Sequence, residues 1–402
     1  MGRREMSSIA DGFASIVLRL SIESDAMNMV EHLGAFTPHR SAPIAIKVGD
    51  RLRVVRAPAA SGQMMAHAYQ VALAMIADKA GLRLCDDCRN HQVLGGFVKR
   101  SLEDPKKFAN KEFEVVSTCV VEDLAGFMIV GRSREGGGEE GGEGGEQGKK
   151  PRKKGKSKED SERSEGLRRT APVWFSYMLP DPRPSSFKFE PQFHVMFNAK
   201  GENRPFTIES ATAIYTMAIG IDVRSIGRAP NKDGAISEVA DRDKRIELAL
   251  EAIRTVIHGQ IFGAKKSRYL PRFEVIGGAA SLSNPIPFML SPPKHVPGEE
   301  SYVSRSYNRA LKMVGGLGRI GVAQNIYIAY FDTEGIVESL ESIVKREGGQ
   351  REKAQNMQKR FCTEDKEGKV GGSVCIEEVG CFDDLINWLR DKIFKGSAER
   401  AK

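Results

Sequence analysis

Hydrophobic and polar residues alternate in several short stretches of the chain, and this alternation predicts β-strands. Residues 16–23 place Ile16 and its large aliphatic counterparts at every second position, which predicts a first strand with at least one buried face. Residues 44–48 and 52–54 alternate around Gly49-Asp50, which predicts two strands joined by a tight turn. Further strands are predicted around residues 113–130, 174–178, 192–198, 211–223 and 273–276.

Two longer stretches repeat apolar residues at helical spacing. From Met64 to Ile76 the pattern predicts a helix that Ser61 caps and Gly81 ends. Residues 241–258 carry an apolar face and a charged face, which predicts a second helix packed on a sheet. Additional helices are expected near residues 333–346 and 382–394.

The order of these elements is strand, helix, strands, helix, strand. This order favours an α+β fold with a modified ferredoxin-like or RNA-recognition-motif core, in which both helices cover one face of an antiparallel sheet. We assign residues 1–291 to this core and its insertions, and residues 292–402 to a C-terminal region that completes or covers the core.

Two segments lack any regular period. Residues 26–43 form a long loop with apolar residues such as Leu33 and Phe36, and loops of this length in compact domains are usually functional. Residues 136–165 consist almost wholly of Gly, Glu, Lys, Arg and Ser, so we expect a flexible surface insertion. Its second half is basic, which leaves loose binding of nucleic acid as an alternative to a solvated loop.

Composition indicates a globular protein but does not by itself identify a binding partner. The 402 residues are 40% hydrophobic, which allows a proper core. The net charge of +8 is compatible with a polyanionic partner, although acidic residues are also abundant. No apolar stretch has the length or form of a membrane span or signal peptide, so we expect a cytoplasmic protein that contacts no membrane.

The start of the first predicted helix is a candidate anion site. Free N–H groups and the helix dipole favour phosphate at a helix N-terminus, and Gly62 would give a ligand room to approach. The alternative is an ordinary capped helix whose N–H groups face water. Two basic loops are expected near this end, and together they would hold phosphates while leaving base edges free. Their basic residues are His39, Arg40, Lys265, Lys266 and Arg268.

The spacing of the cysteines does not by itself predict a metal site, and no cofactor is predicted. Cys85 and Cys88 have the C-x-x-C spacing of a zinc or redox pair, but no second pair follows. Two free thiols or a facultative disulfide is one interpretation, and a metal site completed by His91 or a remote cysteine is the other. Residues 316–321 match G-x-G-x-x-G, but a strand is expected after them, so we interpret them as a glycine-rich turn and not a nucleotide site.

Six blocks of the sequence, taken in order, are similar to the DevR-type CRISPR-associated backbone subunits of archaeal subtype I-A Cascade. The resemblance spans residues 16–291 and rests on NMVEHLG (28–34), TPHRSAP (37–43), SGQMMAHAYQ (61–70), GFM (126–128), QFHV (192–195) and FGAKKSRYLP (262–271).

The resemblance implies a modified RNA-recognition-motif fold whose copies form a helical filament along CRISPR RNA. The implied partners are CRISPR RNA, target DNA through that RNA, further copies of the chain, the fifth Cas family subunit, and the small and large Cascade subunits. In this family the histidine of the QFHV block is associated with RNA binding, so His194 joins the predicted site, although alone it would fit a structural histidine.

We therefore predict a non-enzymatic RNA-binding scaffold. Its predicted RNA-binding residues are Asn28, His39, Arg40, Ser61, Gly62, Gln63, Arg132, Arg134, Arg168, Arg169, His194, Asn198, Lys265, Lys266 and Arg268. A metal-dependent or histidine-based ribonuclease is the alternative. Glu31 is the only acid between residues 26 and 49, which is fewer carboxylates than a metal-assisted nuclease ordinarily uses.

Overall fold

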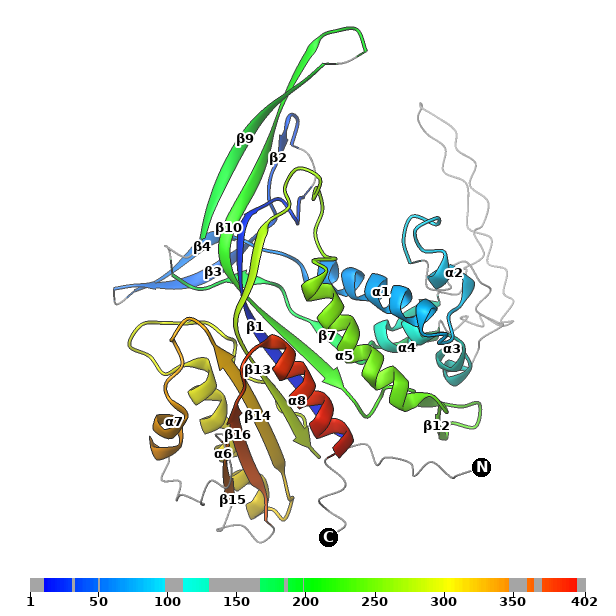
Figure 1. Cartoon of the computed structure of the whole chain (residues 1–402), viewed down its shortest axis with the longest axis vertical. Helices are drawn as coiled ribbons and strands as arrows, with labels where there is room; N and C mark the ends of the chain where they lie inside the picture. The colour runs from blue at the N-terminus through cyan, green and yellow to red at the C-terminus, as the bar shows by residue number, and fades with distance from the viewer. Residues whose placement is uncertain are drawn as a thin grey trace, which may run out of the picture.

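The computed structural model describes residues 11–30, 33–49, 51–97, 111–129, 167–183, 187–197, 199–346, 360–364 and 371–395. A large sheet runs through the molecule, helices lie against it, and one long hairpin projects from it (Figure 1). The predicted α+β class is confirmed. The insertion predicted at residues 136–165 lies outside the described residues.

The sheet is built around β1 (Phe13–Asp25), which pairs antiparallel with β10 (Asn203–Asp222) on one side and β13 (Arg272–Asn284) on the other. Most β1 side chains are buried, because helices cover both sides of this strand. Along its length β10 pairs with β2 (Phe36–Thr37), β7 (Val173–Phe175), β8 (Leu179–Pro180) and β9 (Phe187–Phe197).

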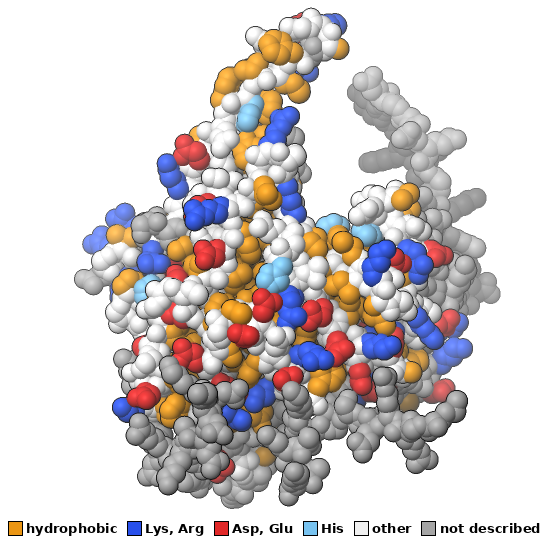
Figure 2. Space-filling view, viewed as in Figure 1, with side chains coloured by type: hydrophobic (Ala, Val, Ile, Leu, Met, Phe, Trp, Pro, Cys, Tyr) orange, Lys and Arg blue, Asp and Glu red, His pale blue; other side chains and the backbone are white. Residues whose placement is uncertain are grey.

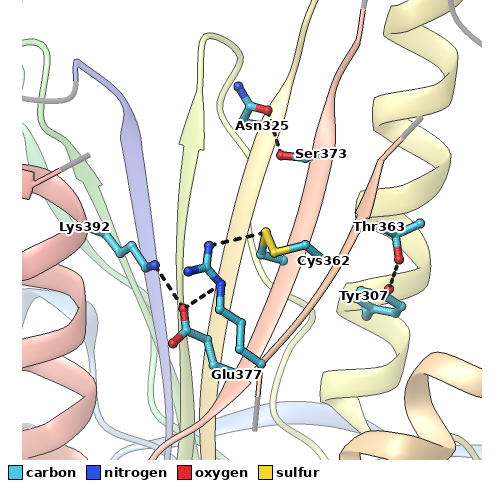
Figure 3. Close-up of a disulfide and its surroundings, with 9 residues drawn as sticks. Tyr307, Asn325, Cys362, Thr363, Ser373, Glu377 and Lys392 are labelled. Atoms are coloured by element: carbon cyan, nitrogen blue, oxygen red, sulfur yellow. Dashed lines mark hydrogen bonds and ion pairs between the residues drawn. A yellow bond between two sulfur atoms is a disulfide. The ribbon is translucent and has the colours of Figure 1, made fainter. Parts of the chain in front are cut away.

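The C-terminal region extends the same sheet. β14 (Asn325–Asp332) pairs with β13, β16 (Ser373–Glu378) pairs with β14, and β15 (Arg360–Glu364) forms the edge. A disulfide between Cys362 and Cys375 joins the two outermost strands (Figure 3). The sequence pattern did not predict this pairing.

Helices cover the two faces of the sheet. On one face α1 (Gly62–Lys79), α5 (Arg242–His258) and α8 (Phe382–Lys395) pack against the side chains of Ile16, Leu18, Leu20 and Ile22. On the other face α6 (Tyr302–Arg319) and α7 (Leu340–Arg346) share a core with Val17. The helices predicted from residues 61 and 241 are therefore confirmed.

Smaller elements surround this core. Beside α1 lie α2 (Asp86–Arg89), α3 (Glu112–Thr118) and α4 (Val120–Ala125), as Figure 1 shows. Two hairpins are formed by β3 (Ser41–Val48) with β4 (Arg51–Pro58) and by β11 (Arg228–Pro230) with β12 (Ile236–Glu238), and β5 (Phe127–Ile129) pairs antiparallel with β6 (Leu167–Arg169). In the described parts of the chain, no helix is long and apolar enough to cross a membrane.

Two predictions of secondary structure are wrong. The β-branched residues near Val115 and Val120 predicted a strand, but they form α3 and α4, because burial of the valines and tertiary packing outweigh a weak local preference. Gly316 and Gly318 were assigned to a turn, yet they lie in α6, whose apolar face of Tyr302, Tyr307 and Val314 packs on the sheet.

Candidate nucleic-acid interface

The loop after β1 is fastened to the N-terminus of α1. Ser61 caps the helix, and its Oγ accepts a hydrogen bond from the Met64 N–H at 3.2 Å. Asn28 Nδ2 donates to the same Oγ at 3.3 Å, and Arg40 Nε donates to Asn28 Oδ1 at 2.6 Å. Three predicted site residues, Asn28, Arg40 and Ser61, thus form one connected set of hydrogen bonds at the helix end.

The loop after α5 packs directly on the loop after β1. The N–H of Ala264 donates to the Met27 carbonyl at 2.9 Å. Gly263 has a φ of 90°, and a Cβ placed there would lie 2.6 Å from the Met27 Cβ, so only glycine fits this close approach. The structure therefore brings the two predicted basic loops together beside the start of α1.

The basic side chains of this region differ in exposure. Arg268 and the neighbouring polar residue Gln63 are exposed, whereas Arg40, Lys265 and Lys266 are half-buried. The Lys266 ammonium donates to the carbonyl of Gln260, and partial burial lowers the pKa of Lys266 from its ordinary value. Cations thus line the place where the loops meet.

His39 does not offer a free ring nitrogen to a ligand, as its place in the predicted site would require. Its side chain is fully buried, with Nε2 2.6 Å from Asp25 Oδ1 and Nδ1 2.7 Å from the Arg40 carbonyl oxygen. The hydroxyl of Tyr215 donates to the other oxygen of Asp25 at 3.2 Å. Buried polar groups need hydrogen-bond partners, so these contacts of His39 hold the loop after β1 in its conformation.

Gly62 is required for a different reason from the one expected. A Cβ at this position would lie 2.4 Å from the carbonyl oxygen of Phe175. The expectation that glycine leaves room for a ligand is wrong, since the backbone at the end of β7 fills that space. The absence of a side chain lets α1 approach the sheet.

Arg168 and Arg169 are adjacent on β6 but face opposite ways. Arg168 is exposed. Arg169 is buried, and all five of its N–H groups donate to Asp123, Glu112 and the carbonyls of Ser225 and Arg228. Its predicted role as an RNA ligand is corrected, because a guanidinium with every donor engaged has none left for phosphate.

The projecting arm formed by β9 and the first half of β10 carries His194. Its Nε2 lies 2.6 Å from the Tyr269 hydroxyl oxygen, and its ring stacks on Phe206 at 5.1 Å between centroids. His194 therefore joins the arm to the loop after α5, since Tyr269 belongs to that loop.

The opposite face of β9 exposes apolar side chains. Phe193, Val195 and Phe197 share one side of the strand, as alternate residues of a strand do. They are 68%, 50% and 68% exposed. Figure 2 shows hydrophobic side chains along the projecting arm.

Sequence reasoning missed the basic residues of the β3–β4 hairpin. Lys47, Arg51 and Arg53 are exposed on it, and the alternation of Arg51 and Arg53 with apolar neighbours was interpreted only as a strand signal. Arg56 on β4 stacks on Phe189 at 4.2 Å and pairs with Glu209 at 2.9 Å. Glu209 also accepts the backbone N–H of His39, so this hairpin is tied to the loop after β1.

Several predicted residues cannot be placed. Arg132, Arg134 and Asn198, together with Glu31 of the nuclease alternative, lie outside the described residues. Within the described residues, no group of three or more carboxylate or histidine ligands gathers in the two loops.

Comparison with known proteins identifies the chain's relatives. A family model described as "CRISPR-associated negative auto-regulator DevR/Csa2" matches residues 16–307. Two proteins of Saccharolobus solfataricus are similar. The "CRISPR-associated aCascade subunit Cas7/Csa2 2" is 26% identical over 81% of this chain and 97% of its own length. The "CRISPR-associated protein Cas7/Csa2 1" is 29% identical over 69% of this chain and 81% of its own.

Solved structures give a more distant likeness. One described as "CRISPR RNA-guided surveillance complex" aligns with a TM-score of 0.37 and 10% identity over 81% of this chain and 91% of its own. Another, "CRISPR RNA-guided surveillance complex, pre-nicking", aligns with a TM-score of 0.46 and 9% identity over 95% of this chain and 100% of its own. Both scores are below 0.5, so the assignment rests on the sequences. The family match covers well over half of the chain, which belongs to the DevR/Csa2 family of CRISPR-associated proteins.

Proposed function

We propose that this protein is a backbone subunit of a type I-A Cascade surveillance complex and that it binds CRISPR RNA through phosphate contacts. Family membership and the name of the Saccharolobus solfataricus aCascade subunit support this role. The strand order β13, β1, β10, β9, with α1 and α5 packed on one face, agrees with a ferredoxin-like or RNA-recognition-motif core.

The observation that carries the proposal is the meeting of the two loops at the N-terminus of α1. Met27, Asn28 and Arg40 belong to one loop, and Ala264 and Arg268 belong to the other. Guanidinium, ammonium and amide donors at one place suit a phosphodiester backbone. A protein that holds backbone and not base edges accepts any spacer sequence and leaves the bases free to pair with target DNA.

The exposed apolar residues of the arm support assembly into a filament. Phe193, Val195, Met196 and Phe197 are each at least half exposed on a hairpin that projects from the rest of the molecule. We propose that these side chains pack on the next copy along the RNA, which would remove them from water. The remaining partners in this proposal are the fifth Cas family subunit and the small and large subunits.

The proposal is tested by the nucleic acid that copurifies with the native protein. RNase digestion of the purified particles should leave protected RNA in a ladder of lengths, because each added copy protects one more segment. The Phe193→Ser/Phe197→Ser variant should still bind RNA but lose the ladder. Absence of RNA from the native protein, at low salt, would count against the proposal.

The second candidate is a ribonuclease, and the pairing of His39 with Asp25 is the observation that favours it. A histidine hydrogen-bonded to a carboxylate is a common acid/base arrangement. Here both side chains are fully buried and both ring nitrogens are engaged, so a substrate oxygen could reach His39 only after the loop opened. We therefore prefer the scaffold.

A further inference from the structure

Three free cysteines from two separate segments lie together beside the C-terminal half of α1. The Sγ atoms of Cys85, Cys88 and Cys119 are all within 4.8 Å of one another. Cys85 and Cys88 belong to the turn that contains α2, and Cys119 joins α3 to α4. Three thiols around a common point are the arrangement of a tetrahedral thiolate metal site, in which Zn–S bonds of about 2.3 Å separate the sulfurs by roughly 3.8 Å.

The surroundings of the sulfurs fit a metal centre. Cys88 and Cys119 are fully buried, and Cys85 is half-buried. The N–H of Cys88 donates to the Cys85 Sγ at 3.5 Å, a contact that stabilises a thiolate. The carboxylate of Glu122, which follows Cys119 by three residues in α4, is also fully buried. A bound dication would neutralise this concentration of negative charge.

The backbone brings the two segments together without help from a long helix. The N–H of Val120 donates to the Arg83 carbonyl at 3.0 Å, which places Cys119 beside the C-x-x-C turn. α2 has only four residues, and a helix of that length has little stability of its own. A metal ion bound by both segments would hold this turn in place.

A fourth ligand is available in His91. Its side chain is 7% exposed, Nδ1 lies 3.1 Å from the Cys88 carbonyl oxygen, and in the described residues Nε2 has no hydrogen-bond partner. A ring that donates from Nδ1 to a backbone carbonyl presents Nε2 as the ligating atom, which is the usual arrangement around bound zinc. The ring stacks on Phe97 and lies outside the group of three sulfurs, so His91 would have to move its side chain to reach a metal ion bound by them.

We propose that Cys85, Cys88 and Cys119 bind one structural zinc ion as thiolates, with His91 as the fourth ligand. This site is distinct from the two basic loops, because Arg89, next to Cys88, pairs with Asp78 near the C-terminus of α1, whereas the basic loops meet at the N-terminus of that helix. The proposal does not depend on the proposed function.

The first test measures metal on the full-length reduced protein. Elemental analysis of the wild type should give one zinc per chain, and replacement by Co²⁺ should give the visible absorption bands of tetrahedral cobalt with thiolate charge transfer. The Cys88→Ser and Cys119→Ser variants should lose both. The control, Cys381→Ser, removes an exposed free cysteine outside the group and should keep both. A wild type that neither contains zinc nor gives tetrahedral cobalt bands would overturn the proposal.

Thiol reactivity gives a second readout on the wild type alone. In the native protein only the Cys381 thiol should react quickly with a thiol reagent, and a chelator should release three more. A disulfide joining any two of Cys85, Cys88 and Cys119 in the unreduced native protein would overturn the proposal. His91→Ala should shift the cobalt bands and weaken zinc binding about tenfold or more. Unchanged bands and affinity would overturn the assignment of the fourth ligand.

Discussion

The two loops that meet at α1 use their polar side chains in opposite ways. The loop after β1 turns Asn28 and His39 inward, where each is buried and hydrogen-bonded. The loop after α5 keeps Arg268 exposed and Lys265 and Lys266 half-buried. The first loop is therefore a support and the second a contact surface, so changes in the two loops should have different consequences for folding and for RNA binding.

Buried and exposed polar side chains also lie next to each other on β6, and there we predict the largest change in the free energy of unfolding. Arg169→Ala would leave the buried carboxylate of Asp123 without one of its two arginine partners, because only Arg245 would remain. The free energy of unfolding should fall by about 4 kcal/mol in chemical denaturation. Arg168→Ala, one residue away and exposed, is the matched control and should change it by less than about 0.5 kcal/mol. Equal effects for the two variants would refute the assignment of Arg169 as structural.

His39→Ala should have the next largest effect. The change leaves Asp25 buried and deprived of one hydrogen bond, and the free energy of unfolding should fall by about 2 kcal/mol. RNA affinity should fall because the loop loses its shape, but the dependence of affinity on salt should stay that of the wild type. A lower salt dependence with unchanged stability would make His39 a direct phosphate ligand.

If the loop after α5 holds phosphates, RNA affinity should depend little on base sequence. Unrelated single-stranded RNAs of equal length should bind with free energies that differ by less than about 1 kcal/mol, the least that one specific base contact contributes. Affinity should fall steeply as salt rises, since phosphates are held. Titrations at fixed salt that separate the RNAs more widely would indicate base readout.

Finally, we expect no RNA cleavage. With Mg²⁺ or Mn²⁺, labelled RNA should stay intact over hours with the wild type, with Glu31→Gln and with His39→Ala. Cutting that requires metal and disappears in Glu31→Gln would favour the metal-dependent nuclease. Cutting that persists in EDTA and disappears in His39→Ala would favour histidine acid/base chemistry.

Local pattern predicted the elements whose periodicity agrees with their packing. α1 and α5 were predicted nearly to their ends, because Ser61 supplies a cap and the apolar residues of α5 face the sheet. α3 and α4 were not, since their valines favour strands locally and become helical in a buried environment. Burial by distant segments cannot be deduced from spacing alone.

The candidate site shows the same limit at the level of single side chains. Sequence correctly joined the loop of Arg40 to the loop of Arg268. It could not tell which polar side chains turn inward, because their partners are set by tertiary packing: Asp25 for His39 and Asp123 for Arg169. Likewise, alternation on β9 placed Phe193 and Phe197 on one face but could not show that this face meets solvent.

The most direct test of the account is RNA affinity measured across salt for two variants matched in charge. Lys266→Ala with Arg268→Ala removes two cations from the loop after α5. Lys312→Ala with Arg319→Ala removes two exposed cations from α6, which lies on the opposite face of the sheet. We predict that the first pair lowers the salt slope by about one unit for each lost phosphate contact, about two in all, while the second matches the wild type. Curves for the two variants that coincide would contradict the claim that these loops hold the RNA backbone.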